Sequence, residues 1–533
     1  MVWAIIRGSV YRKTSMLLRS RSSAIPRTLP YALALVACLA GPAHAQLPTL
    51  GDGSDMAAGA ERRLGDRIAR ELYRDPDYID DPVLVEYVQQ IWERLVAAAK
   101  ARGEMTPELQ ERFAWEILLG RDRSVNAFAL PGGYMGVNLG LMGVVTSEDE
   151  LASVLAHEMS HVTQRHISRL MTQQSRQTPL LLASMVLGAL AASKSPDAAN
   201  ALILGGQAVA AQNQLNFSRD MEREADRVGY GVMTQAGYSG QGFVSMFEKL
   251  QQASRINDNG SFPYLRSHPL TTQRIADMQQ RHQLEASTPA GTAPDLAHAM
   301  VAARARVLAN RAADVERLWL SEPDLAGFAS LEASRRAASL YAAALISLRQ
   351  RDFARARGFA ARLTKEVQGH PAAERQARLL AAELELAAGA PQRALDLLAA
   401  DPAATGWAGK LRRPELVLKT QAQLQLGQAG TPPAGGSMAD ALQTWLATHP
   451  KDATVWQLLA SVYRLEQQPL RAIRAEAEAQ VALRDYAAAM DRFRAGQDLA
   501  RHSTAAADHV EASIIDTRAR DVQSLLREQA AER

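Results

Sequence analysis

The chain has 533 residues, of which 47% are hydrophobic, 22% charged and only 5% aromatic. Because a single hydrophobic core stops growing at roughly 250–300 residues, this length excludes one compact domain, and the abundance of Ala and Leu predicts a mainly α-helical protein. The formal net charge of +3 comes from 60 Lys and Arg against 57 Asp and Glu, a balance that argues against nucleic acid as a partner.

The first 45 residues are typical of an export signal. They contain six basic residues and no acidic residue, followed by an apolar run from Tyr31 to Ala40 and the small-residue motif AHA that ends at Ala45. Ten apolar residues are too few to span about 30 Å of hydrocarbon, so a permanent membrane anchor is the weaker interpretation. We therefore expect cleavage after Ala45 and export of the remaining chain.

Two alternatives stay open at this end of the chain. Translation from Met16 would shorten an otherwise unusually long signal. The segment Leu35-Val36-Ala37-Cys38 resembles a lipoprotein box, and cleavage there would leave Cys38 lipidated at the new N-terminus. Cys38 is also the only cysteine of the chain. Cleavage after Ala45 would therefore remove the only thiol, and a metal site would have to use His and carboxylate ligands.

Composition divides the exported chain into two parts. Residues 46–285 combine helical patterns with a Gly-rich strand signal and predict an α+β domain with a small β-sheet. Residues 286–294, with the sequence ASTPAGTAP, are small and polar and contain two prolines, which predicts a linker. Residues 295–533 are rich in Ala, Leu, Arg and Gln and predict an all-α domain.

The second part repeats itself. Residues 351–356, 389–394 and 484–489 each resemble the junction between two antiparallel helices, and residues 456–463 keep the Trp, Leu, Ala and Tyr spacing of the first helix of a tetratricopeptide repeat. We expect about four irregular repeats, stacked as a solenoid whose extended surface suits peptides or partner proteins. The alternative is an Ala-rich helix bundle that braces the first part.

A helix that carries chemistry is expected from residue 148. Ser147 and Glu150 form a capping box before an apolar run, and His157-Glu158-Met159-Ser160-His161 follows on the same helix. Two histidines four residues apart share one face and can bind one metal ion, whereas Glu158 is turned about 100° away. Glu158 is therefore the candidate general base toward an attacking water.

The third metal ligand is expected downstream, because a catalytic zinc site needs three protein ligands. Glu222 and Asp226 lie four residues apart on one predicted helical face. Glu222 is the candidate ligand, and Asp226 the candidate acceptor of the second N–H group of His157. On helical spacing Glu224 is expected to face solvent and His166, five residues after His161, to be structural.

These motifs together resemble the M48 family of zinc peptidases, which includes CAAX-processing membrane proteases. The resemblance rests on His157-Glu158-x-x-His161 and on the later Glu222-x-x-Ala225-Asp226. Residues 126–138 resemble the family's strand before the metal helix, and residues 267–275 resemble its late His-Pro motif. The resemblance implies a gluzincin-type α+β metalloendopeptidase domain with one Zn²⁺ per chain, bound by the two histidines and Glu222.

The export signal and the repeats narrow the resemblance to a periplasmic branch of the family that serves the assembly of outer-membrane β-barrel proteins. It implies that unfolded or misassembled outer-membrane proteins are the substrates, and that the barrel assembly machinery binds the repeat domain. The competing hypothesis is a periplasmic chaperone or scaffold in which zinc is structural. Glu158 speaks against it, because a structural site needs no acid beside its first ligand.

A strand expected next to the site is a candidate substrate-binding edge. It follows a Pro-Gly-Gly turn and comprises Tyr134, Met135, Gly136, Val137 and Asn138. An unpaired edge would bind a substrate strand through main-chain hydrogen bonds, which makes cleavage tolerant of sequence. The alternative is an internal strand with neighbours on both sides.

Two apolar runs of 14 residues each, 179–192 and 198–211, are too short to span a bilayer. We expect residues 179–211 to form a helical hairpin that lies against the cleft or makes a peripheral contact with a membrane, with simple core packing as the alternative.

Two residues of the late motif have open roles. His268 is expected in a loop, where it would act as a fourth ligand that gates the zinc, as a donor to the oxyanion, or as a packed histidine without a role. Arg274 would contact a carboxylate ligand or an oxygen of the transition state, and spacing alone does not choose between these.

Overall fold

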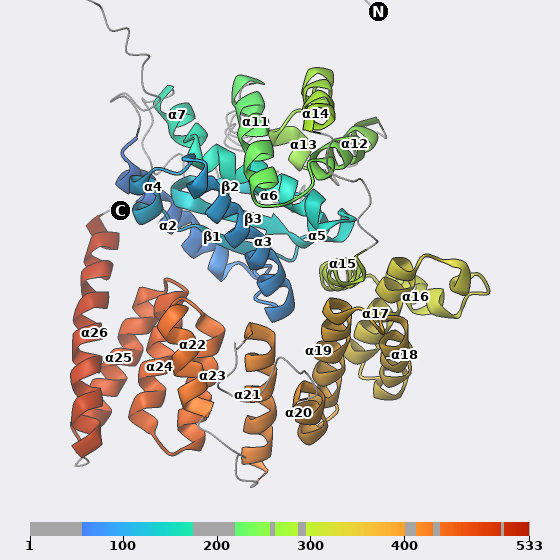
Figure 1. Ribbon diagram of the computed structural model, residues 1–533. Coiled ribbons are helices and arrows are strands. Elements are labelled where there is room, and N and C mark those ends of the chain that lie inside the picture. Colours follow the sequence, from blue (N-terminus) through green and yellow to red (C-terminus); the bar gives the residue numbers. More distant parts are fainter. Residues whose placement is uncertain are drawn as a thin grey trace, which may run out of the picture. The chain divides into compact units, whose positions relative to one another are not determined.

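The computed structural model describes residues 56–173, 219–255, 262–285, 295–399, 412–429, 438–502 and 506–531. The predicted export signal, Cys38, the apolar hairpin 179–211 and the linker 286–294 lie outside these residues. The described chain is mainly helical with one small sheet, as predicted (Figure 1). None of its helices is both long and apolar enough to cross a bilayer.

The first part contains ten described α-helices and three strands. Helix α3 begins where the sequence supplies two N-terminal signals, since the Asp81 side chain accepts from the backbone N–H of Leu84 and Pro82 is the first helical residue. The helices are α2 (Ala58–Arg74), α3 (Pro82–Ala101), α4 (Pro107–Arg112), α5 (Leu139–Val144), α6 (Glu148–Thr163), α7 (His166–Gln173), α11 (Arg219–Gln235), α12 (Gln241–Arg255), α13 (Tyr264–Ser267) and α14 (Thr272–Glu285).

The sheet corrects the predicted edge strand. It consists of β1 (Glu116–Gly120), β2 (Ala127–Leu130) and β3 (Tyr134–Asn138) in the order β1-β3-β2, with β1 parallel and β2 antiparallel to β3. The predicted edge residues Tyr134, Met135, Gly136, Val137 and Asn138 are therefore central, and all five are buried.

Packing explains why β3 is central. The Phe128 ring of β2 lies against Gly136, where a Cβ atom would overlap the ring. Close packing thus requires a glycine at this position, in keeping with the internal strand that the sequence left as the alternative. Of the two edge strands of this sheet, β2 is the one that packs against α6.

The second part consists of helices that pack in consecutive pairs, such as α17 with α18 and α23 with α24. The predicted junctions lie between helices, and each contains a residue with positive φ: Arg351 (61°), Gly389 (74°) and Arg484 (59°). The helices are α15 (Leu296–Ala309), α16 (Ala313–Ser321), α17 (Ala333–Arg349), α18 (Phe353–Glu366), α19 (Pro371–Ala387), α20 (Pro391–Ala399), α21 (Arg413–Gln428), α22 (Met438–Thr448), α23 (Ala453–Leu465), α24 (Pro469–Ala482), α25 (Tyr486–Ala500) and α26 (Ala506–Ala531). Short 3₁₀ turns occupy Pro131–Gly133, Glu322–Asp324 and Phe328–Ser330.

Helix α15 belongs to two hydrophobic cores. Val301 and Ala305 pack into the core that surrounds the sheet, whereas Met300 and Val307 pack with α17 and α18. The predicted boundary at residues 286–294 therefore separates two compositions but not two independently packed cores.

Buried arginines also join the two parts, which lie in one compact unit. Each of three arginines of the second part binds one carboxylate of the first part and one of the second, with nitrogen–oxygen distances of 2.6–2.8 Å. Because each guanidinium has two carboxylate partners, its charge is compensated on both sides. The triplets are Arg304 with Asp81 and Glu383, Arg375 with Glu86 and Glu415, and Arg413 with Asp80 and Asp452.

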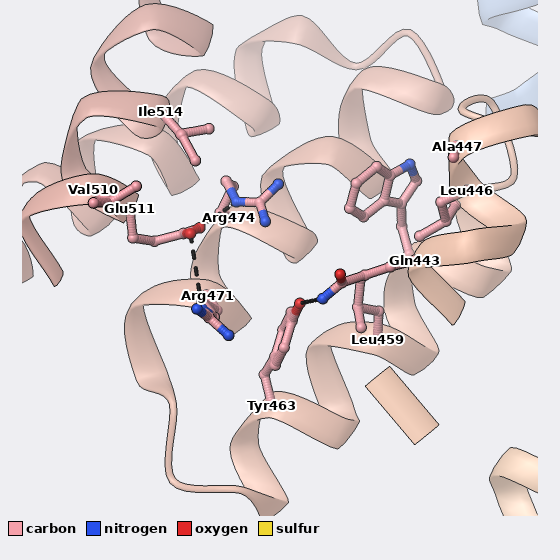
Figure 2. A pocket seen from close by; sticks show the side chains of 11 residues that line it. Gln443, Leu446, Ala447, Leu459, Tyr463, Arg471, Arg474, Val510, Glu511 and Ile514 are labelled. Carbon is pink, nitrogen blue, oxygen red and sulfur yellow. Dashed lines mark hydrogen bonds and ion pairs between the residues drawn. The ribbon is translucent and has the colours of Figure 1, made fainter. Parts of the chain in front are cut away.

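A cavity of about 410 Å³ lies among α22, α23, α24 and α26 (Figure 2). Its lining combines apolar side chains with two arginines, Arg471 and Arg474, which share the carboxylate of Glu511. Val510 and Ile514 line it as well and are 67% and 38% exposed. The cavity thus joins exposed apolar surface to a cationic patch.

Candidate metal centre

Helix α6 begins at the predicted cap. The Ser147 side chain accepts from the Glu150 backbone N–H at 3.2 Å, and the Glu150 carboxylate accepts from the Thr146 N–H at 2.7 Å. The first contact satisfies a free N–H group of the first helical turn, and the second joins the residue before the cap to the same turn. The helix is buried from Glu150 to Thr163, so His157 and His161 lie in the protein interior.

Helix α11 lies directly against α6. At Gly229 the two backbones approach so closely that a Cβ atom would lie 3.0 Å from the backbone of Ala156 and His157. This contact aligns the two helices, and Glu222 lies two turns before Gly229 on α11. The acid pair and the histidine pair, far apart in sequence, thus share one site.

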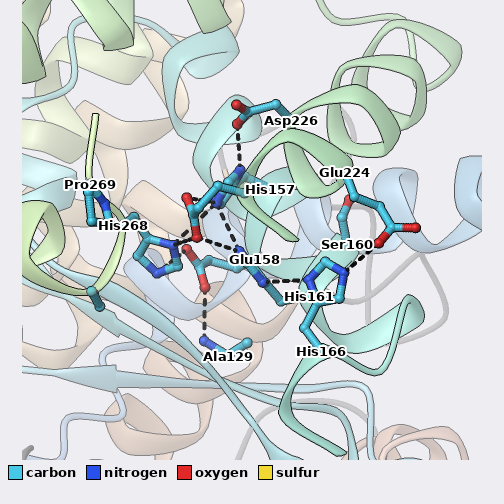
Figure 3. Close-up of polar contacts among 12 residues, drawn as sticks. Ala129, His157, Glu158, Ser160, His161, His166, Glu224, Asp226, His268 and Pro269 are labelled. Atoms are coloured by element: carbon cyan, nitrogen blue, oxygen red, sulfur yellow. Dashed lines mark hydrogen bonds and ion pairs between the residues drawn. The ribbon is translucent and has the colours of Figure 1, made fainter. Parts of the chain in front are cut away.

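Four ligand-type atoms converge between these helices and the loop after α13 (Figure 3). Nε2 of His157 lies 3.0 Å from Nε2 of His161, and each lies 3.5 Å from a carboxylate oxygen of Glu222. Nδ1 of His268 lies 3.3 Å from Nε2 of His157 and 3.0 Å from Oε1 of Glu222. All four residues are at most 2% exposed.

The distances fit a tetrahedral ion. Nitrogen and oxygen ligands about 2.0–2.1 Å from a tetrahedral centre lie roughly 3.3 Å from one another. The distances given above, which involve both oxygens of Glu222, are 3.0–3.5 Å, and one ligand atom from each of the four residues lies within 4.8 Å of the others. Two imidazoles, a carboxylate and a further imidazole are also a donor set that binds divalent transition metals. The residues present therefore fit a metal ion.

The electrostatics also favour a cation in the site. Burial alone would lower the pKa of His157, but Asp226 and Glu222 raise it to about 9. The pKa of Glu222 is well below its ordinary value, because His268 and His157 outweigh the effect of burial. The site thus stabilises a positive charge, which a bound metal ion supplies in place of a proton.

Asp226 and Arg274 support the ligands from behind. Oδ1 of Asp226 lies 2.9 Å from Nδ1 of His157, the histidine for which the sequence predicts this contact. Arg274 binds Asp226 through two nitrogens at 2.6 and 2.7 Å and lies 2.7 Å from Glu222. Of its two predicted roles, the structure gives Arg274 the contact with a carboxylate ligand.

Glu158 lies beside the four atoms and is fully buried. Its Oε2 accepts a hydrogen bond from the Ala129 backbone N–H of β2 at 3.0 Å, and its Oε1 lies 3.3 Å from Nε2 of His268. The edge strand β2 therefore fixes the orientation of this carboxylate. No sequence motif indicated this contact, because it depends on the order of the strands.

Two residues that helical spacing placed elsewhere lie next to the site. Nδ1 of His166 is 2.8 Å from Nδ1 of His161, and Nε2 of His166 is 3.0 Å from Glu224, whose side chain is 20% exposed. The expectation that Glu224 faces solvent is therefore wrong. The spacing argument failed because α6 ends at Thr163 and Arg165 has a φ of 54°, so His166 starts a new helix.

Residues 82–282 match the model of peptidase family M48. The beta-barrel assembly-enhancing proteases of Escherichia coli and Yersinia pestis are 35% and 33% identical to this chain, over 44% and 52% of it and 47% and 54% of their own lengths. The mitochondrial metalloendopeptidase OMA1 of Saccharomyces cerevisiae is 28% identical over 36% of this chain and 54% of its own length. The chain thus matches about half the length of each relative. The matched range contains all four residues of the metal cluster.

Proposed function

We propose that this protein is an exported, zinc-dependent endopeptidase that acts in the periplasm on unfolded or misassembled outer-membrane β-barrel proteins. The observation that carries the proposal is the buried cluster of His157, His161 and Glu222 with the carboxylate of Glu158 beside it. The similarity to beta-barrel assembly-enhancing proteases supports the substrate class.

His157, His161 and Glu222 would hold the zinc. When bound, zinc would polarise the scissile carbonyl and lower the pKa of an adjacent water molecule. Glu158, oriented by the Ala129 N–H, would accept the proton of the attacking water and then pass it to the leaving amine. Arg274 and Asp226 would hold the ligands in place.

The substrate would bind along β2 (Ala127–Leu130). This strand has β3 on one side and contacts Glu158 through Ala129. A substrate strand added to this edge would bring its main chain to the general base without a requirement for particular side chains. This assignment replaces the predicted edge at residues 134–138.

His268 would gate the site. Its Nδ1 lies 3.3 Å from Nε2 of His157 and 3.0 Å from Glu222, and its Nε2 is 3.3 Å from Glu158, so His268 would be able to bind the ion as a further ligand. In this position the imidazole excludes the water that Glu158 must activate. Movement of His268 would open the site when a substrate or partner binds.

The second part of the chain would act as a tetratricopeptide-like binding domain for the barrel assembly machinery or for substrates. The cavity lined by Arg471 and Arg474 supports this role, because its exposed apolar wall and cationic patch suit a peptide with apolar and acidic side chains. Arg471 is the more accessible of the two, with 46% of its side chain exposed.

One observation favours the competing function of a chaperone with structural zinc. With His268 in place the site has four protein ligand atoms, which is the arrangement of closed structural sites. Glu158 distinguishes the two functions, because a structural site has no use for a buried carboxylate that does not bind the ion.

The decisive experiment is degradation of an unfolded outer-membrane barrel protein by the purified chain, with and without a chelator. We expect cleavage that stops with the chelator and returns with zinc. The Glu158→Gln variant, loaded with zinc, serves as the matched control and should not cleave. Equal protection of the client from aggregation by both proteins, without cleavage by either, would favour the chaperone.

A further inference from the structure

We propose that His166, Glu224 and Arg169 form a relay that holds the metal-binding ring of His161 in one orientation and one tautomer. These residues are positioning residues, since none of them is among the four residues whose ligand atoms form the metal cluster. The inference rests on the proposed metal site and adds three residues to it.

The backbone places His166 for this task. Helix α6 ends at Thr163, and Arg165 adopts a φ of 54°, so that α7 starts at His166 with its side chain returned toward α6. The Arg165 side chain lies 3.0 Å from the buried Glu61 and also contacts the Met56 carbonyl. These contacts hold the turn against the beginning of α2.

The proton positions in the relay follow from the contacts. When Nε2 of His161 binds a metal, its ring proton must be on Nδ1, which then donates to Nδ1 of His166 at 2.8 Å. His166 accepts there, so its own proton is on Nε2 and donates to Oε2 of Glu224 at 3.0 Å. Only one arrangement of protons satisfies both contacts.

The far end of the relay is a held carboxylate. Nη1 of Arg169 lies 3.0 Å from the same Oε2 of Glu224 that accepts from His166. Arg169 follows His166 by three residues on α7, so one turn of this helix supplies both partners of Glu224. The arginine keeps this carboxylate in place as an acceptor.

His157, the other candidate ligand histidine, is also held by a carboxylate and an arginine, but without an intervening imidazole. His157 contacts Asp226 directly, and Asp226 is held by Arg274. At His161 one imidazole is inserted between the ligand and the carboxylate. Both carboxylates lie on α11, which also supplies Glu222, so the position of α11 sets one ligand and the orientation of two others.

The test is zinc affinity, measured by chelator competition on the full exported chain, together with the visible spectrum of the cobalt-loaded protein. His166→Leu removes both hydrogen bonds and should weaken zinc binding about 10–100-fold. His166→Gln keeps an acceptor and a donor and should recover most of this loss. His370→Leu, an exposed histidine of the second part, is the matched control and should bind zinc like the parent.

Glu224→Ala is the second variant. Its side chain is partly exposed, so the fold should tolerate the change even if His166→Leu does not fold. We expect several-fold weaker zinc binding and a shifted cobalt spectrum.

Parental zinc affinity in both His166→Leu and Glu224→Ala would overturn the relay. Equal losses in His166→Leu and His166→Gln would overturn it too, because they would mark a packing role. A parent chain that binds no zinc would instead overturn the proposed metal site, and the relay with it.

Discussion

Replacement of Gly229 by Ala tests whether the contact between α6 and α11 sets the metal centre. The new methyl group would lie 3.0 Å from the C and O atoms of Ala156 and from N of His157. These atoms belong to a helix backbone and cannot move separately. To reach an ordinary contact, α11 must therefore move away from α6 by about 0.4 Å.

The magnitude follows from two opposing effects. Overpacking of a close backbone contact costs about 1–3 kcal/mol, whereas Gly→Ala in a helix stabilises by about 0.4–1 kcal/mol. We expect a net loss of roughly 1–2 kcal/mol in the free energy of unfolding. A shift of 0.4 Å also exceeds the roughly 0.2 Å tolerance of metal–ligand distances. Glu222 lies on the displaced helix, so zinc binding should weaken about tenfold or more.

The assay compares zinc affinity and denaturant unfolding of Gly229→Ala with those of Gly231→Ala. At Gly231 a methyl group would meet only the guanidinium end of Arg102, a flexible side chain that is one-third exposed and can move aside. Gly231→Ala should therefore bind zinc like the parent and be equally or slightly more stable. If both variants bound zinc like the parent, or if both lost zinc affinity to the same extent, the argument that this contact sets the site would be refuted.

Four further outcomes are expected. Glu158→Gln should lower peptidase activity at least about 100-fold with one zinc per chain retained, whereas His157→Ala should lose the metal; parental cleavage by the Glu158 variant would contradict its role as base. His268→Ala should raise basal cleavage if it gates the site, while a loss of about 100-fold would indicate an oxyanion donor and no change an inert residue, with zinc content measured in each case. Deletion of residues 311–533 should leave a protein that binds zinc. Deletion of residues 295–533 should not, because it removes Val301 and Ala305 of α15 from the first core. Equal zinc content of the two proteins would contradict the conclusion that the first core needs α15. Arg471→Ala should weaken periplasmic crosslinking to partners without changing cleavage of a short unfolded peptide, and unchanged crosslinking would remove the cavity from the binding role.

The features that the sequence predicted are those set by local signals. The capping box at Ser147 starts α6, and periodic spacing puts His157 with His161, and Glu222 with Asp226, on common faces. Mainly helical structure follows from composition alone. Each of these predictions needs only local sequence, either a cap, a helical spacing or the composition.

The features that it did not predict depend on contacts between distant segments. Residues 134–138 form a central strand that is buried on both faces of the sheet. An edge strand can have the same apolar, Gly-containing sequence, so the sequence pattern does not determine the order of the strands. His166 was misplaced because the helical period was continued through Arg165, a non-glycine residue with positive φ that no motif marks. Glu224 was misplaced because its partners His166 and Arg169 lie on the helix after that turn. The position of His268 likewise depends on how a loop packs over two helices.

Because α15 packs into both hydrophobic cores, we expect the two parts of the chain to associate even when the chain is cut within residues 286–294. Val301 and Met300 lie in different cores, and Arg304 of the same helix binds the N-cap acid of α3. A molecule nicked between residues 286 and 294 should migrate as one particle and come apart only in denaturant. Two separately synthesised fragments, 46–285 and 295–533, should bind each other through α15 and together recover zinc binding.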